Sequence, residues 1–194
     1  VKNSEVSFLS DTPGLLLPNS AITDLNGLIS INAISKITGI YAISASIFGS
    51  TQKWTLIFYD PNSSASGTGW YIPLDGNGVS LNGKATFEFA SKYTKNIASG
   101  NLDFQFNTGQ IKLKSTGISW VVVSGSIVQF KGTATVNGEA GYFFQVTAQD
   151  KAEPGVGKDT FAIKIWNGDP ENGGILIHSS CNTISGGSIQ VRAK

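Results

Sequence analysis

The sequence is poor in the residues on which most catalytic sites depend. Its 194 residues include one histidine, His178, and one cysteine, Cys181. On a continuous strand these two side chains, three positions apart, point to opposite faces and form no Cys–His pair. One His and one Cys also cannot complete a tetrahedral zinc shell without several carboxylates. Paired carboxylates of the glycoside hydrolase kind stay open, because such a pair is defined by separation in space. We therefore predict a non-enzymatic protein.

Charge, methionine and long apolar runs are scarce as well. Charged residues make up 14% of the chain and the net charge is +1, without a basic cluster, so nucleic acid is not an expected partner. No apolar run reaches the length of about 18 residues that a membrane span needs. The chain starts at Val1 and has no Met, which suggests that an upstream segment was removed. Together with polarity supplied by Ser, Thr, Asn and Gly, this predicts a secreted, extracellular or cell-surface protein.

Period-two alternation of apolar residues is the strongest pattern that is present. It places Phe87, Phe104 and Phe161 on the inward faces of strands at 84–90, 102–107 and 160–166. Further strands are predicted at 27–34, 37–48, 53–59, 110–114, 117–123, 126–136, 141–149, 174–178 and 187–193. Glycines such as Gly67, Gly69, Gly186 and Gly187 are interpreted as turn residues, and Trp54 and Trp120 as core. The predicted fold class is all-β: a two-sheet antiparallel sandwich, jelly-roll or Greek-key like.

The amino-terminal residues contain apolar side chains that need a place to be buried. Residues 1–18 are predicted to form an arm, followed by a single β-sandwich domain over residues 19–194. The arm could act as a donor strand that completes the sheet of a neighbouring subunit. Its predicted assembly interface consists of Val6, Phe8, Leu15, Leu16 and Leu17.

Two acidic loops are candidate calcium sites. Calcium prefers six to eight oxygen ligands, which acidic turns can supply. The first loop carries Asp150, Glu153 and Asp159, and the second carries Asn167, Asp169 and Glu171. Neither loop has the spacing of an EF-hand, and acidic residues also favour turns for geometric reasons.

Two tryptophans are candidate ligand or interface residues. Trp166 follows the outward phase of its strand, opposite Phe161, Ile163 and Ile165. An outward Trp can stack on a sugar ring, anchor a protein interface or cover a sheet edge. Trp70, which follows Gly67 and Gly69, can point either way.

Four long segments stand out: GKATFEFASKY (83–93), LDFQFNTGQIKLKSTGISWVVVSG (102–125), FKGTATVNGEAGYFFQVTAQD (130–150) and KDTFAIKIWNG (158–168). They resemble a known family, the post-COAP domain of exported prokaryotic proteins. With GTGW (67–70) and GGSIQVRAK (186–194), the resemblance covers about residues 67–194. It implies an exported β domain and brings no catalytic residues.

The overall design is similar to subunits of extracellular filaments or tubules, in which one subunit's strand completes a neighbour's sheet. We therefore expect a structural subunit that self-assembles with identical copies by strand exchange, with calcium as a possible requirement. The rival hypothesis is a monomeric cell-surface adhesive or carbohydrate-binding module that uses Trp166 and Trp70 on a glycan.

Overall fold

The computed structural model describes residues 1–74 and 78–193, and it divides the chain into two compact units. Unit 1 is Val1–Tyr59 and unit 2 is Asp60–Lys194. The predicted boundary at residue 18 differs from this division. The difference arises because the amino-terminal strand pairs with two other strands of unit 1 and is not a separate arm.

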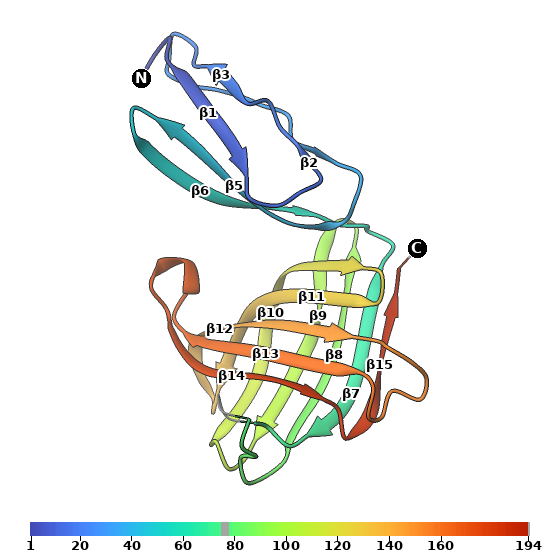
Figure 1. Ribbon diagram of the computed structural model, residues 1–194. Helices are drawn as coiled ribbons and strands as arrows, with labels where there is room; N and C mark the ends of the chain where they lie inside the picture. Colours follow the sequence, from blue (N-terminus) through green and yellow to red (C-terminus); the bar gives the residue numbers. More distant parts are fainter. Residues whose placement is uncertain (75–77, 194) are drawn as a thin grey trace. The chain divides into compact units, whose positions relative to one another are not determined.

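Unit 1 is built around one four-stranded antiparallel sheet with the order β3-β1-β5-β6 (Figure 1). A second, two-stranded sheet pairs β2 with β4. The strands are β1 (Glu5–Ser10), β2 (Leu15–Leu16), β3 (Ser20–Ile22), β4 (Ile34–Ser35), β5 (Gly39–Ile47) and β6 (Ser50–Phe58).

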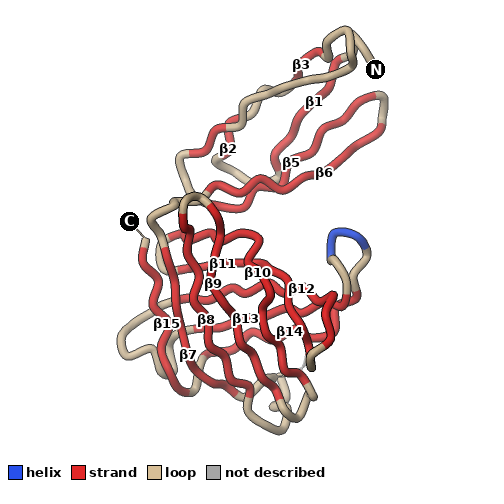
Figure 2. The backbone as a smooth tube through the Cα atoms, turned by 180° about the vertical axis from the view of Figure 1, so that it is seen from behind, coloured by secondary structure: helices blue, strands red, loops and turns tan. Residues whose placement is uncertain are grey.

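Unit 2 is one nine-stranded antiparallel sheet with the order β14-β13-β12-β11-β10-β9-β8-β7-β15 (Figure 2). Its elements are β7 (Ser64–Tyr71), β8 (Ala85–Thr94), β9 (Ile97–Phe106), β10 (Ile111–Ser124), β11 (Ile127–Val136), β12 (Glu139–Gln149), β13 (Thr160–Asn167), the 3-10 turn η1 (Pro170–Asn172), β14 (Ile175–Thr183) and β15 (Gly186–Arg192). Strands β7 to β14 follow one another as a meander. The all-β antiparallel class is thus confirmed.

The strand connectivity of unit 2 differs from the predicted jelly-roll or Greek-key connectivity. In jelly-roll and Greek-key folds, long connections place strands that are not consecutive in sequence side by side. Here each described strand from β7 to β14 pairs with the next one along the chain. The two packed sheets of a sandwich are not confirmed either, because the described strands of unit 2 belong to one sheet.

The sheet of unit 2 curls on itself and encloses the core. Phe87 on β8 and Phe161 on β13 stack with ring centroids 4.0 Å apart. Five strand spacings separate these strands in the sheet order, which corresponds to about 24 Å in a flat sheet. The sheet therefore folds over until its two halves pack face to face. Among the described residues, the 24 side chains of the hydrophobic core all belong to unit 2.

Several predicted strands need correction. Residues 27–34 form no strand except at β4, because the Asp24 carboxylate accepts hydrogen bonds from the backbone of Asn26 and Leu28 and turns the chain. Segments 110–114 and 117–123 are one strand, β10, with register shifts near Gly117. Strand β7 was missed because its two glycines were interpreted as a turn.

Those glycines lie inside β7 to make room for aromatic rings. A Cβ on Gly67 would clash with the ring of Phe89, and a Cβ on Gly69 with the ring of Phe87. The small residues thus let two large rings of the neighbouring strand lean over β7, which increases packing in the core.

Hydrogen bonds made by side chains join the strands at the two ends of the meander. The hydroxyl groups of Tyr71 on β7 and Ser180 on β14 are 2.7 Å apart, and the Asn182 amide donates to the Ile72 carbonyl at 3.2 Å. His178 continues this cluster, with its Nε2 3.2 Å from the Ser180 hydroxyl and its ring 5.5 Å from that of Phe104. Burial raises the pKa of Tyr71 and lowers the pKa of His178.

We predict that His178 makes stability depend on pH. Its folded pKa lies below the ordinary value of 6.5, so the unfolded chain binds a proton more readily. The contribution to stability is complete above about pH 6.5 and is lost as the pH falls from there through the folded pKa. Urea unfolding between pH 8 and pH 5 should show the wild type losing stability relative to His178→Phe, which keeps a ring beside Phe104. A difference between the two proteins that stays constant over this range would contradict the prediction.

Candidate functional site

The sheet of unit 1 has one predominantly apolar face. Strand register places Val6, Phe8, Tyr41, Ile43, Trp54 and Leu56 on the same side, which we call the apolar face of unit 1. The opposite side carries Ser7, Ser44, Ser46, Thr51, Lys53 and Thr55 among its residues. This separation is typical of a sheet that packs against another element.

The chain covers this apolar face in part: Phe8, Ile43 and Leu56 are half-buried and Trp54 is exposed. In unit 1, all of whose residues the structure describes, Val6 and Tyr41 are the buried hydrophobic side chains. Trp54, predicted to be core, is 52% exposed. The other exposed large hydrophobic residues of unit 1 are Val1, Leu9, Leu16, Ile22, Leu25, Leu28, Ile34, Ile37 and Phe48. These residues lie on the opposite face, in the β2–β4 pair or in loops, so Trp54 is the exposed large side chain of the apolar face itself. An exposed tryptophan can anchor an interface.

The predicted assembly residues are divided between two places. Val6 and Phe8 lie in β1, between β3 and β5, with Val6 buried and Phe8 half-buried on the apolar face. Leu15 and Leu16 form β2, where Leu16 is 65% exposed, and Leu17 follows it half-buried. Sequence analysis missed the contributions of Ile43, Trp54 and Leu56, although the alternation in β6 placed Trp54 and Leu56 on one face.

The first predicted calcium loop instead holds β15 in place. The buried Asp159 carboxylate accepts hydrogen bonds from the backbone of Lys151 and Ile189, each at 2.9 Å. The Asp150 carboxylate accepts from the backbone of Val191 at 3.1 Å, and Glu153 accepts from the Ser188 hydroxyl at 3.2 Å. All three carboxylates therefore bind donors on the last strand.

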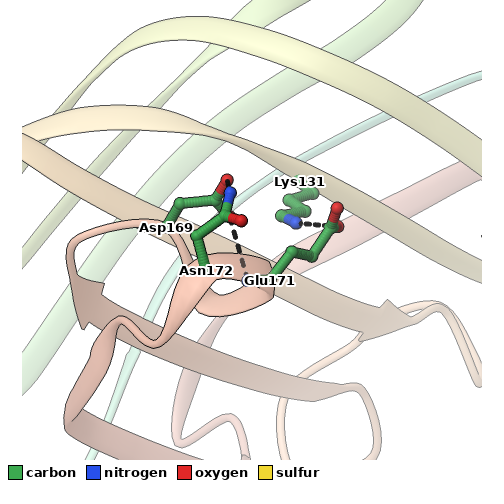
Figure 3. Close-up of polar contacts among 4 residues, drawn as sticks. All are labelled: Lys131, Asp169, Glu171 and Asn172. Carbon is green, nitrogen blue, oxygen red and sulfur yellow. Dashed lines mark hydrogen bonds and ion pairs between the residues drawn. The ribbon is translucent and has the colours of Figure 1, made fainter.

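The second predicted calcium loop is also satisfied internally. Figure 3 shows Asp169 accepting hydrogen bonds within the turn from the backbone of Glu171 and the amide of Asn172. These bonds, that of the Glu171 backbone foremost, lower the pKa of Asp169. Glu171 forms an ion pair with Lys131 of β11 at 2.6 Å. Asn167, the third predicted ligand, ends β13 and is exposed.

These arrangements do not resemble a calcium shell. In the part of the chain that the structure describes, no three His, Cys, Asp or Glu side chains are grouped so that they could hold a metal ion. A cation at Asp159 would have to displace the backbone N–H groups that now bind its oxygens. Calcium binding stays a prediction, which these occupied carboxylates do not favour.

The two candidate tryptophans lie on different parts of the outer surface of unit 2. Trp166 is half-buried on β13, paired across the strands with Phe143 and Leu176. Trp70 is half-buried on β7, beside a groove of about 390 Å³ on the outer face of strands β15, β7, β8 and β9. The structure thus places the two residues on separate strands and does not bring them into one site.

His178 and Cys181 lie on opposite faces of β14, as a continuous strand requires. Cys181 is exposed and pairs across the sheet with Ala162, whereas His178 faces the aromatic rings of Phe104 and Phe106. Trp120, predicted to be core, is half-buried and pairs with Lys131. Among residues 1–74 and 78–193 there is no helix with the length and apolar character that crossing a membrane demands.

We predict that Asp159 is a major contributor to the stability of unit 2. Asp159→Asn presents an amide N–H₂ to a backbone N–H, so at least one buried donor loses its acceptor. We expect a loss of about 2–4 kcal/mol in the free energy of unfolding. Glu153→Gln, an exposed member of the same loop, should cost under about 0.5 kcal/mol. Urea unfolding of both variants tests this, and equal losses would contradict it.

Comparison with known proteins adds no identification: no family model, no curated protein and no solved structure matches this chain. The resemblance to the post-COAP domain therefore stays a prediction.

Proposed function

We propose that the protein is a non-enzymatic, extracellular structural subunit that associates with identical copies through the apolar face of unit 1. The observation that carries this proposal is the exposure of Trp54 on the apolar face, beside the half-buried Ile43 and Leu56. Low charge and the predominance of β-strands are typical of exported β proteins and support an extracellular location.

The size of unit 1 supports the same conclusion. A domain of about 60 residues is marginally stable even with a well-formed core, and smaller cores often depend on oligomerisation. Unit 1 has 59 residues and two buried hydrophobic side chains. Burying its apolar face against a second copy would supply the missing hydrophobic contacts.

The open edges of the sheet offer a way to extend the assembly. In the sheet order β3-β1-β5-β6, the described strand β6 pairs on one side only, with β5. An edge strand of nine residues can accept a further strand through its backbone groups. Repeated head-to-tail addition does not close on itself and leads to a filament or tubule.

Strand exchange would use β1 as the donor. In this structure β1 pairs with β3 and β5 of its own chain, so an exchanged β1 would form the same pairs in a neighbouring copy. Exchange would therefore conserve the native hydrogen bonds while linking subunits.

We predict that Trp54 is a main contact in self-association. Trp54→Glu places a charge in the apolar face and should weaken association at least about tenfold. Thr55→Glu is the matched control, since it adds the same charge to the next residue of β6 on the opposite face. Analytical ultracentrifugation of the full chain from about 1 to 500 μM, followed by negative-stain microscopy, gives the measurement. A wild type that stays monomeric throughout, or equal effects of the two variants, would overturn the proposal.

A cross-linking experiment tests strand exchange separately. Ser7 on β1 is directly opposite Ser46 on β5, close enough for a disulfide if both become cysteine. In a Cys181→Ser background, Ser7→Cys with Ser46→Cys should yield covalent multimers on non-reducing gels if β1 is exchanged. Cross-linked monomers from assembled material would show that β1 stays in its own chain, and would limit the mechanism to contact between faces.

A further inference from the structure

We propose that the outer face of unit 2 binds a hydroxyl-rich glycan in the groove beside Trp70. This site lies in the other unit from the assembly surface and does not depend on it. We call it the Trp70 groove and define it by Thr68, Trp70, Thr86, Glu88, Asp103 and Gln105.

The groove arises from the strand register. Trp70, Thr86 and Gln105 form one row across β7, β8 and β9. Thr68, Glu88 and Asp103 form the neighbouring row. Alternation along each strand directs all six to the outer face, while Phe87 and Phe104 between them face the core. The site therefore stands on a rigid sheet, which limits the entropy that binding has to overcome.

Glycine shapes the depression and positions the indole. A Cβ on Gly186 of β15 would overlap Nε1 of Trp70, so only the absence of a side chain lets the indole lie across that strand. Gly187 also lines the groove, at a backbone φ of 100°. The Lys84 ammonium lies 4.1 Å from the centre of the Trp70 ring. That flexible and exposed side chain can leave the ring when a ligand stacks there.

Two carboxylates, Glu88 and Asp103, line the groove, and Lys114 of β10 lies directly opposite Asp103. Glu88 and Asp103 are directly opposite each other on β8 and β9, an arrangement of like charges that costs stability. Within the described residues, neither carboxylate takes part in an ion pair or a side-chain hydrogen bond. Their oxygens can accept hydrogen bonds from a ligand, and Lys114 balances part of their negative charge.

The combination fits a neutral glycan. A sugar ring has an apolar C–H face that stacks on an aromatic ring, and its edges carry hydroxyl groups that donate to carboxylates and exchange hydrogen bonds with amides. The Trp70 groove offers the indole, two carboxylates and the Gln105 amide around one open depression with a volume of about 390 Å³.

Affinity electrophoresis provides the test. Full-length protein is run in native gels that contain a soluble β-glucan, a xylan, a mannan or a galactan, and the oligosaccharide of any retarding polymer is titrated calorimetrically. Trp54→Glu, in which self-association should be weakened, is run alongside. Retardation that this variant shares with the wild type does not arise from self-association. We expect retardation by at least one polymer. Trp70→Ala and the exposed Gln105→Ala should each weaken binding about tenfold or more.

Asn101→Ala is the matched control, because Asn101 lies on the same strand as Gln105, faces the same side and is outside the groove. It should bind like the wild type. Circular dichroism melting of each variant shows whether unit 2 stays folded. The proposal would be overturned if no polymer retarded the protein, or if both groove variants bound the glycan as well as the wild type does. Binding of calcium without binding of any glycan would also overturn it. Each of these outcomes is independent of the result of the sedimentation experiment, which tests self-association through the apolar face of unit 1.

Discussion

A curled β-sheet that does not close through backbone pairing leaves two edges open, and in unit 2 side chains bind one edge and join the two halves of the sheet. Strands β14 and β15 are the two edges of the sheet, although they follow each other in sequence. Asp159 accepts from the outward N–H of Ile189, and Ser180 bonds to Tyr71 across the core. A carboxylate buried in this way is stable only with several donors around it, which the loop and β15 supply together. The enclosed aromatic core depends on these bonds, because they keep the two halves of the sheet folded together.

Unit 1 presents the opposite situation. Its sheet has the same alternation and the same pairing, yet it has too few residues to build a second layer over Trp54 and Ile43. The result is an exposed apolar face on one unit and a closed core on the other within a single chain. Burying the exposed tryptophan would remove apolar surface from water, which favours association. Under the proposed function, unit 2 folds around its own core and unit 1 would gain stability by contact with other copies.

Alternation of apolar residues predicted much of the fold because it is a local property. The strands containing Phe87, Phe104 and Phe161 have the predicted inward faces, and His178 and Cys181 face opposite ways on β14. What could not be predicted depends on pairs distant in sequence. Asp159 binds Ile189 from 30 residues away, so the sequence of the loop alone does not reveal this partner. Gly67 and Gly69 resembled a turn because the rings that require them belong to the next strand. Trp54 seemed to be core because nothing in β6 reveals that its sheet lacks a covering layer.

Glycines shape both faces of the sheet at β7. Inside the sheet, Gly67 and Gly69 leave space for the rings of Phe89 and Phe87, which stack toward Phe161. Outside, the absence of a side chain at Gly186 lets the Trp70 indole lie across β15. Because β15 is held against β7 by its ladder and against the acidic loop by Asp150 and Asp159, the strand under the indole is fixed from both sides. The bonds that close the core therefore also hold the floor of the Trp70 groove, so the shape of this surface depends on the integrity of the acidic loop.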